Sequence, residues 1–227
     1  MDADAYHKIM DILRLSGVQL LAVSKTKTTD EILSLYNLGQ RDFGENYVQE
    51  LAGKHAVLPG DIRWHFIGHL QSNKVKIIAP FVHMIQSVDS LKLLLEIEKH
   101  AVKNQRNIYC LLQIHIAKEE TKFGLDEKEF DSVLQSITSL KSSGQLSKVK
   151  ISGCMGMASL TANQEEVRRE FDTLKALQDK LARALPEDAV ETLSMGMSSD
   201  YRIAIEAGST MVRIGSLIFG ERQDAHK

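Results

Sequence analysis

A lysine at the end of an apolar stretch is the first residue of this chain whose type and position could do chemistry. Lys25 directly follows residues 19–24, which we expect to form a buried strand. In a barrel of alternating strands and helices, the carboxyl ends of the strands face the active-site mouth. Apolar surroundings there would lower the pKa of the lysine amine, and a neutral amine can attack an aldehyde. Lys25 alone does not distinguish this chemistry from a solvated residue after a strand.

Two segments near the carboxyl end of the chain could hold a phosphate. Gly196, Ser198 and Ser199 lie between an expected strand and a helix, and Gly215 and Ser216 follow the last expected strand. Helix N-termini present free N–H groups with positive partial charge, hydroxyls add donors, and glycine allows close approach. Each segment alone also suits an ordinary helix start. Together they indicate an anion site after strands seven and eight, where barrels often bind phosphate.

The lysine and the anion site would meet at one part of the mouth, because the first strand of a closed barrel neighbours the eighth. The meeting residues are Lys25, Ser198, Arg213 and Ser216. Pyridoxal 5′-phosphate (PLP) requires this arrangement, since its aldehyde forms a Schiff base with a lysine and its phosphate anchors the ring. A sugar-phosphate aldolase needs the same two elements. Arg213 favours PLP, which has a ring nitrogen that needs a partner.

Strands alternate with helices along the whole chain, which predicts βαβ units and a parallel sheet. Strands are expected at 19–24, 42–44, 64–67, 84–88, 109–116, 149–155, 190–194 and 211–214. Helices are expected at 7–15, from an N-cap at Thr29 or Asp30 to 38, at 45–55 and 70–79, from an N-cap at Asp89 or Ser90 to about 103, at 126–140 and 163–185, from an N-cap at Ser199 or Asp200 to 207, and at 215–219, with a loop at 117–124. Eight such units match a single (β/α)8 TIM barrel over residues 1–227 better than the alternative, a doubly wound open sheet.

Composition limits the partners and the compartment. The 227 residues carry a net charge of -2 without a long basic block, so we expect no nucleic-acid partner. Neither a stretch of about 18 apolar residues nor a signal peptide is recognisable, so we expect no membrane association. The two cysteines, Cys110 and Cys154, lie in expected buried strands. They suit reduced core thiols in a cytoplasmic protein better than a disulfide.

Five segments in order carry a family resemblance: 22–27, 43–50, 64–74, 193–200 and 212–220. With these segments the chain resembles the YggS/PROSC family of PLP homeostasis proteins, over about residues 20–220. The resemblance implies a barrel similar to the N-terminal domain of alanine racemase, without that enzyme's C-terminal β domain. The absence of a second domain favours a monomer.

The resemblance also implies roles for individual residues. Lys25 matches the lysine that forms the Schiff base, and Arg213 matches the residue that faces the pyridine nitrogen. Phosphate contacts are implied for Ser198, Gly215 and Ser216. Asn46 matches a residue that lines the pocket near the ring.

Arg213 bears on whether the protein is an enzyme. A guanidinium only donates hydrogen bonds, so a pyridine nitrogen facing it should stay unprotonated and make PLP a weaker electron sink. Racemisation would also need a base on the opposite ring face, which in alanine racemase is a tyrosine of the other subunit's C-terminal domain. We therefore expect a PLP-binding protein that stores, buffers or delivers PLP, with PLP-dependent apoenzymes as its partners. The alternatives are an amino-acid racemase and a barrel that only binds other proteins.

A metal site is not predicted. His65 and His69 have the spacing of a helical metal pair. Residues 64–67, however, favour a strand, and Gly68 breaks any helix, so the two imidazoles would not share a helix face.

Overall fold

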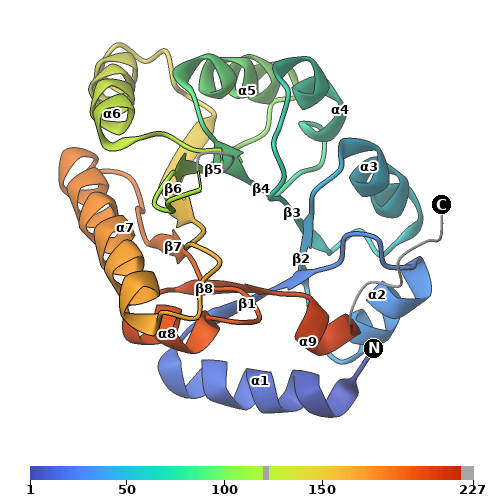
Figure 1. The fold of residues 1–227 in the computed structure, drawn as a ribbon. Helices are drawn as coiled ribbons and strands as arrows, with labels where there is room; N and C mark the ends of the chain where they lie inside the picture. Colours follow the sequence, from blue (N-terminus) through green and yellow to red (C-terminus); the bar gives the residue numbers. More distant parts are fainter. Residues whose placement is uncertain (120–122, 221–227) are drawn as a thin grey trace.

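The structure, a computed structural model, describes residues 1–119 and 123–220. Within this part of the chain, eight parallel strands close into a barrel in sequence order (Figure 1). They are β1 (Gln19–Val23), β2 (Asp42–Glu45), β3 (Arg63–Phe66), β4 (Met84–Val88), β5 (Ile108–Ile114), β6 (Val149–Gly156), β7 (Thr192–Ser194) and β8 (Met211–Ile214). The barrel closes where Ala22 of β1 pairs with Ile214 of β8. This closure confirms the predicted (β/α)8 fold and is incompatible with an open doubly wound sheet.

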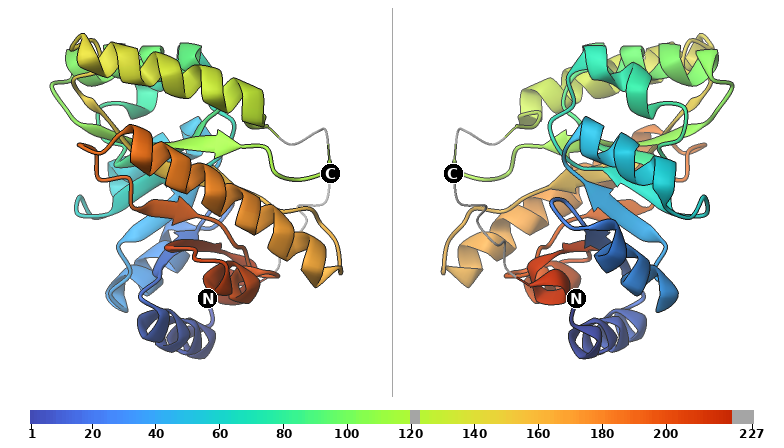
Figure 2. Two further views of the ribbon diagram at one scale, coloured as in Figure 1. Left: turned by 90° about the vertical axis from the view of Figure 1, so that its left-hand side faces the viewer. Right: turned by 90° about the vertical axis from the view of Figure 1, so that its right-hand side faces the viewer.

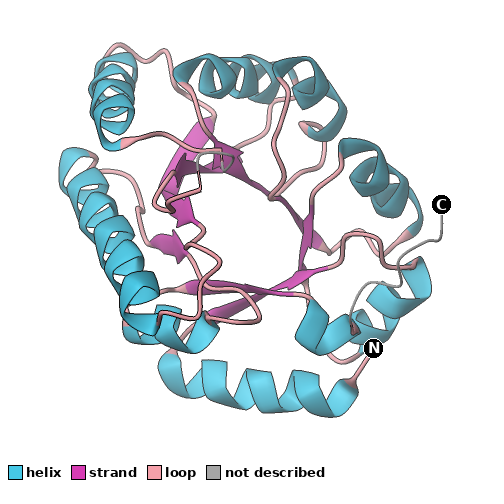
Figure 3. Cartoon of the chain, in the orientation of Figure 1, coloured by secondary structure: helices cyan, strands magenta, loops and turns pink. Residues whose placement is uncertain are grey.

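Helices surround the strands on the outside (Figure 3). They are α1 (Ala3–Ser16), α2 (Thr29–Asn37), α3 (Val48–Val57), α4 (Val75–Ile78), α5 (Leu91–Lys103), α6 (Glu127–Ser142), α7 (Gln164–Ala184), α8 (Tyr201–Glu206) and α9 (Ser216–Phe219), with a 3₁₀ turn η1 (Ser72–Lys74) before α4. None of the helices in the described ranges is long and apolar enough to cross a membrane.

The longest helix, α7, illustrates why the helices pack as they do. Val167, Phe171, Leu174 and Leu181 recur at intervals of three, four and seven residues and are buried, so they form one apolar stripe. The Asn163 side chain caps the helix by accepting the Glu166 N–H. The side views show α7 lying along the outside of the barrel (Figure 2). Its stripe thereby covers the sheet.

The main core lies between the strands and the helices, and a smaller cluster lies inside the barrel. The main core includes Phe43, Trp64 and Phe66, all almost fully buried. Met84, Leu111 and Met155 form the separate inner cluster, with Met157 against it. The alternation of side chains along each strand produces this division, because successive residues point to opposite faces.

Two helix starts differ from the sequence prediction because of capping. The first helix begins before residue 7, since the Asp2 side chain caps it. The N-cap of α2 is Thr28, not Thr29 or Asp30, and Thr28 forms a reciprocal capping box with Glu31. In both cases a side chain upstream of the expected start satisfies the first free N–H groups.

Two further segments differ from the prediction in their type of secondary structure. Glu45, expected to open a helix, is the last residue of β2, and α3 begins only at Val48. The helix expected at 70–79 is reduced to η1 and the single turn of α4. The loop expected at 117–124 includes 120–122, which lie outside the described residues. β4 and β8 have the predicted bounds.

Candidate functional site

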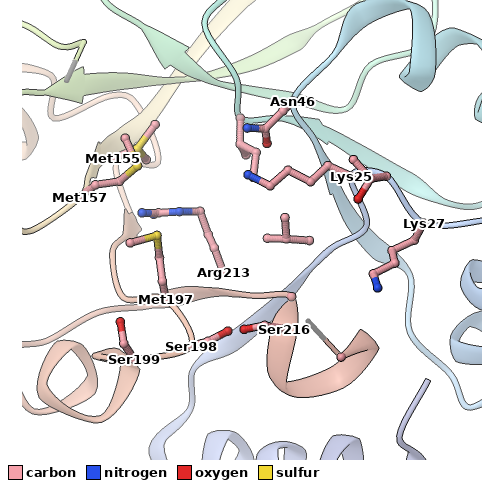
Figure 4. Close-up of a pocket in the computed structure, with 15 residues that line it drawn as sticks. Lys25, Lys27, Asn46, Met155, Met157, Met197, Ser198, Ser199, Arg213 and Ser216 are labelled. Carbon is pink, nitrogen blue, oxygen red and sulfur yellow. The ribbon is translucent and has the colours of Figure 1, made fainter. Parts of the chain in front are cut away.

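A pocket of about 400 Å³ opens at the carboxyl ends of the strands (Figure 4). The structure brings all six predicted site residues to its lining. The lining residues are Val23, Lys25, Thr26, Lys27, Asn46, Ile67, Met155, Met157, Met197, Ser198, Ser199, Arg213, Gly215, Ser216 and Gly220. In Figure 4 the Lys25 amine points toward the middle of the pocket, whereas the Lys27 amine points away from it.

The backbone on both sides of Lys25 is fixed by hydrogen bonds. Ser24 is fully buried and its Oγ donates to Glu45 Oε1 over 2.6 Å. Thr26 has φ 64°, an uncommon conformation for a β-branched residue. Its N–H donates to Glu50 Oε1 over 2.6 Å, which holds the chain in that conformation. The turn that carries Lys25 is therefore held at both of its ends.

Lys54 of α3 joins these two contacts into one buried cluster. Its ammonium donates to Ser24 O, Glu45 Oε1 and Glu50 Oε1, each over 2.7 Å. The Glu45 side chain has no exposed surface, and burial raises its pKa although the Lys54 charge and hydrogen bond oppose that rise. Removing one partner of such a buried pair leaves an uncompensated charge, so the pair is costly to separate. Because Lys54 belongs to α3 and bonds to Ser24 O, the cluster holds α3 against the turn at Lys25.

The loop after β7 supplies one side of the expected anion site. Ser198 lies half-buried in it, and the Met197 N–H donates to Asp200 Oδ1 over 2.5 Å. Gly196 has φ 94°, and a Cβ there would lie 2.5 Å from Ala204 Cβ of α8. Glycine is therefore needed here for the packing of the loop against α8. Its close approach to a phosphate stays a prediction.

The loop after β8 supplies the other side. Gly215 lies close to β1, since a Cβ on it would be 3.0 Å from Val23 O. Ser216 opens α9, and the first N–H groups of a helix have no partner within it. Figure 4 shows the hydroxyls of Ser198 and Ser216 at the same lower edge of the pocket. Hydroxyl and N–H donors from two loops thus border one end of the cavity.

Arg213 comes from β8 and is only 4% exposed. Its Nη1 donates to Ser194 O over 2.7 Å and to Ser194 Oγ over 2.8 Å, and its Nη2 donates to Gly156 O over 2.8 Å. Burial lowers the pKa of Arg213 to about 10, which leaves the guanidinium charged at neutral pH. A guanidinium has five N–H donors, so these bonds account for three of them.

Two more features of the lining suit a polar ring. Asn46 Oδ1 is buried and has no hydrogen-bond partner within residues 1–119 and 123–220, as expected of an amide that meets a polar group of a ligand. Met155, Met157 and Met197 lie across the pocket from Lys25 (Figure 4). Thioether side chains make favourable contacts with aromatic rings. The pocket residues therefore fit three parts of PLP: the Lys25 amine suits the aldehyde, the Arg213 guanidinium suits the ring nitrogen, and the hydroxyls of Ser198 and Ser216 suit the phosphate.

The methionines of the pocket and the polar residues inside the strands were not predicted from the sequence. A polar residue in a mostly apolar strand, such as Gln86 in β4, was the available signal. His65 and His69 have separate partners: His65 lies 3.1 Å from Asp42 inside the barrel, and His69 pairs with Asp89. In the described parts of the chain, no three His, Cys, Asp or Glu side chains are grouped to hold a metal ion.

The fold and the pocket define a barrel of the class found at the amino end of alanine racemases. Residues 3–223 match the family described as alanine racemase, N-terminal domain. Alanine racemase of Bartonella henselae shares the fold at 17% identity and a TM-score of 0.69, covering 98% of this chain and 62% of that chain. The racemase thus extends well beyond the matched barrel.

Within that class, the chain belongs to the family of pyridoxal phosphate homeostasis proteins. It is 40% identical to the Aquifex aeolicus member over 206 residues, which cover 90% of this chain and 87% of the relative. It is 39% identical to the human member over 221 residues, which cover 92% and 78%. PipY of Synechococcus elongatus, solved with PLP bound, is 34% identical with a TM-score of 0.86, covering 96% of this chain and 99% of PipY.

Proposed function

We propose that this chain binds PLP at the barrel mouth and serves intracellular PLP homeostasis. The observation that carries the proposal is the convergence of Lys25, Arg213, Ser198 and Ser216 on one pocket. The relatives named as PLP homeostasis proteins, and PipY with PLP bound, support the same ligand. When bound, PLP supplies an aldehyde for an amine and a ring that can accept electrons.

The six predicted site residues each have one task in this proposal. Lys25 would supply the amine that bonds to the aldehyde carbon, with the aldehyde oxygen leaving as water, and the cluster around Lys54 keeps the turn of Lys25 in place. Ser198, Ser216 and the N–H groups at the start of α9, next to Gly215, hold the phosphate. Arg213 donates to the ring nitrogen, and Asn46 borders the ring.

The protein holds PLP without efficient catalysis on amino acids. Racemisation needs proton carriers on both faces of Cα. Among the residues that line the pocket, the only ionisable side chains are Lys25, Lys27 and Arg213, and the side of the pocket across from Lys25 is lined by methionines (Figure 4). A racemase, the alternative that the shared fold raises, would exchange the Cα proton of an amino acid for deuterium at an enzymatic rate. We expect exchange no faster than with free PLP.

The proposal extends to assembly, compartment and partners. We expect a monomer, which light scattering of the PLP-loaded protein would test. The free buried thiols of Cys110 and Cys154, whose pKa values burial raises, suit a reducing compartment such as the cytoplasm. Release of PLP to apoenzymes is testable by mixing the loaded protein with a PLP-free enzyme and following its activation.

Borohydride reduction tests the central assignment. The PLP-loaded protein should absorb at the visible edge, lose this band on reduction, and yield a peptide in which Lys25 carries the added mass. Lys25→Ala should abolish the adduct, whereas Lys99→Ala, on an exposed face of α5, should keep it. An adduct on Lys27 with Lys25 unmodified would contradict the assignment.

A further inference from the structure

A continuous line of hydrogen bonds crosses the inside of the barrel, from the pocket to its opposite end. Arg213 Nη1 lies 2.8 Å from Ser194 Oγ, which lies 2.7 Å from Gln86 Oε1. Gln86 Nε2 lies 3.0 Å from His65 Nδ1, and His65 Nε2 lies 3.1 Å from Asp42 Oδ1. Each of the five residues is at most 5% exposed. They come from five different strands, so the line exists only in the closed barrel.

The two ends of this line fit one direction for every hydrogen bond in it. Arg213 can only donate, so Ser194 Oγ accepts from it and, with the Gln86 amide oriented as in the structure, gives its own hydrogen to the Gln86 oxygen. The Gln86 NH₂ group then faces His65 Nδ1 as the donor. His65 Nε2 donates to Asp42, which as a carboxylate only accepts.

The Asp42 end is held in its ionised form. Burial raises the pKa of Asp42, but hydrogen bonds from His65 and Arg63 more than offset this, so the pKa lies well below its usual range. Arg63 Nε donates to Asp42 Oδ1 over 2.7 Å. His83 packs with its ring centroid 5.4 Å from that of His65, and burial lowers the pKa of His83 to about 4. His83 is thus neutral near pH 7 and does not add a positive charge near Asp42.

We propose that Ser194, Gln86, His65 and Asp42 are positioning residues for Arg213. Both hydrogens of Arg213 Nη1 go to Ser194, and one of Nη2 goes to Gly156 O, which fixes the guanidinium plane. The Nε hydrogen and the second Nη2 hydrogen are then the donors left to meet a ring nitrogen. The line keeps Arg213 in the orientation that holds this nitrogen unprotonated. The inference rests on the proposed binding of PLP.

The hydrogen bond between Arg213 and the ring nitrogen can be measured by comparing the binding of PLP with that of 1-deaza-PLP, in which CH replaces the ring nitrogen. A hydrogen bond from a charged donor should make the full-length wild-type protein bind PLP about tenfold more tightly than the analogue. Gln86→Leu and, as a smaller change, Ser194→Ala should bring this ratio to within about threefold of unity, because Arg213 loses its support. Gln178→Leu is the matched control: it removes a buried amide that bonds Cys154 N and Val190 O, away from the line.

Nitrogen NMR of PLP labelled at its ring nitrogen measures the protonation state of that nitrogen. A general loss of structure would not change this protonation state in the bound ligand. The ring nitrogen should be unprotonated in wild type and in Gln178→Leu, and should become partly protonated in Ser194→Ala. A PLP preference equal in Ser194→Ala, Gln178→Leu and wild type would overturn the positioning role. A wild type that binds PLP and 1-deaza-PLP equally would overturn the nitrogen contact itself. Failure of wild type to bind PLP at all would instead refute the proposed function.

Discussion

Removing the two hydroxyls at the phosphate end of the pocket should weaken PLP binding by a predictable factor. Ser198 and Ser216 come from the loops after β7 and β8 and border the same cavity. A hydrogen bond to a charged group contributes about 1.5–3 kcal/mol, and 1.4 kcal/mol corresponds to a tenfold change in affinity. Each serine-to-alanine change should therefore weaken PLP binding by about 10- to 150-fold, and the double variant by about 100- to 20,000-fold.

Pyridoxal, which lacks the phosphate, isolates this effect. Both ligands offer the same aldehyde to Lys25, so the ratio of their dissociation constants, measured by absorbance titration, changes only through the phosphate contacts. The double variant should bind pyridoxal within about threefold of wild type. A control variant, Ser34→Ala with Ser136→Ala, removes two exposed hydroxyls from α2 and α6 and should leave both constants unchanged. Equal weakening for PLP and pyridoxal would refute the phosphate site.

Three further predictions concern the frame that holds the pocket. Gly153→Ala should lower the free energy of unfolding in urea by more than about 2 kcal/mol, because Gly153 has φ 148° and a Cβ there would lie 1.8 Å from Thr192 O; an unchanged midpoint would contradict the contact. Lys54→Met should lower this free energy by about 3–5 kcal/mol by leaving Glu45 buried without its cation, and adding Glu45→Gln should restore part of it. Because the folded pKa of Asp42 is lowered, its stabilisation is present above the unfolded pKa of about 4 and is lost as pH falls through the folded value. Asp42→Asn should therefore flatten the fall of Tm in acid, and an unchanged acid slope would count against the assignment.

The fold was predictable from the sequence because its signals are local. Apolar runs such as 84–88 and 211–214 predicted strands with the bounds that β4 and β8 have. Regular alternation of strands with helices then predicted the closed barrel. Where the prediction failed for α2, a local side-chain contact decided: the reciprocal bonds of Thr28 and Glu31 place the N-cap at Thr28, one residue before the predicted caps. β2 also extends beyond its predicted end to include Glu45.

The sequence by itself also determined which residues could form the pocket. A polar residue placed just after an apolar strand must lie at the mouth of a parallel barrel, whatever the details of packing. This rule applies to Lys25, Asn46, Ser198 and Ser216, and the structure places all four around one cavity. The chemical roles of these residues stay predictions until ligand binding is measured.

Only the tertiary structure decided what supports those residues. Ser194 and Gln86 are 108 positions apart in the chain, and Lys54 reaches Ser24 across 30 positions. Their hydrogen bonds depend on strand register and on the direction in which each side chain points into or out of the barrel. Because a one-residue shift in register would reverse that direction, no local pattern encodes such contacts, and they exist only once the eight strands have closed.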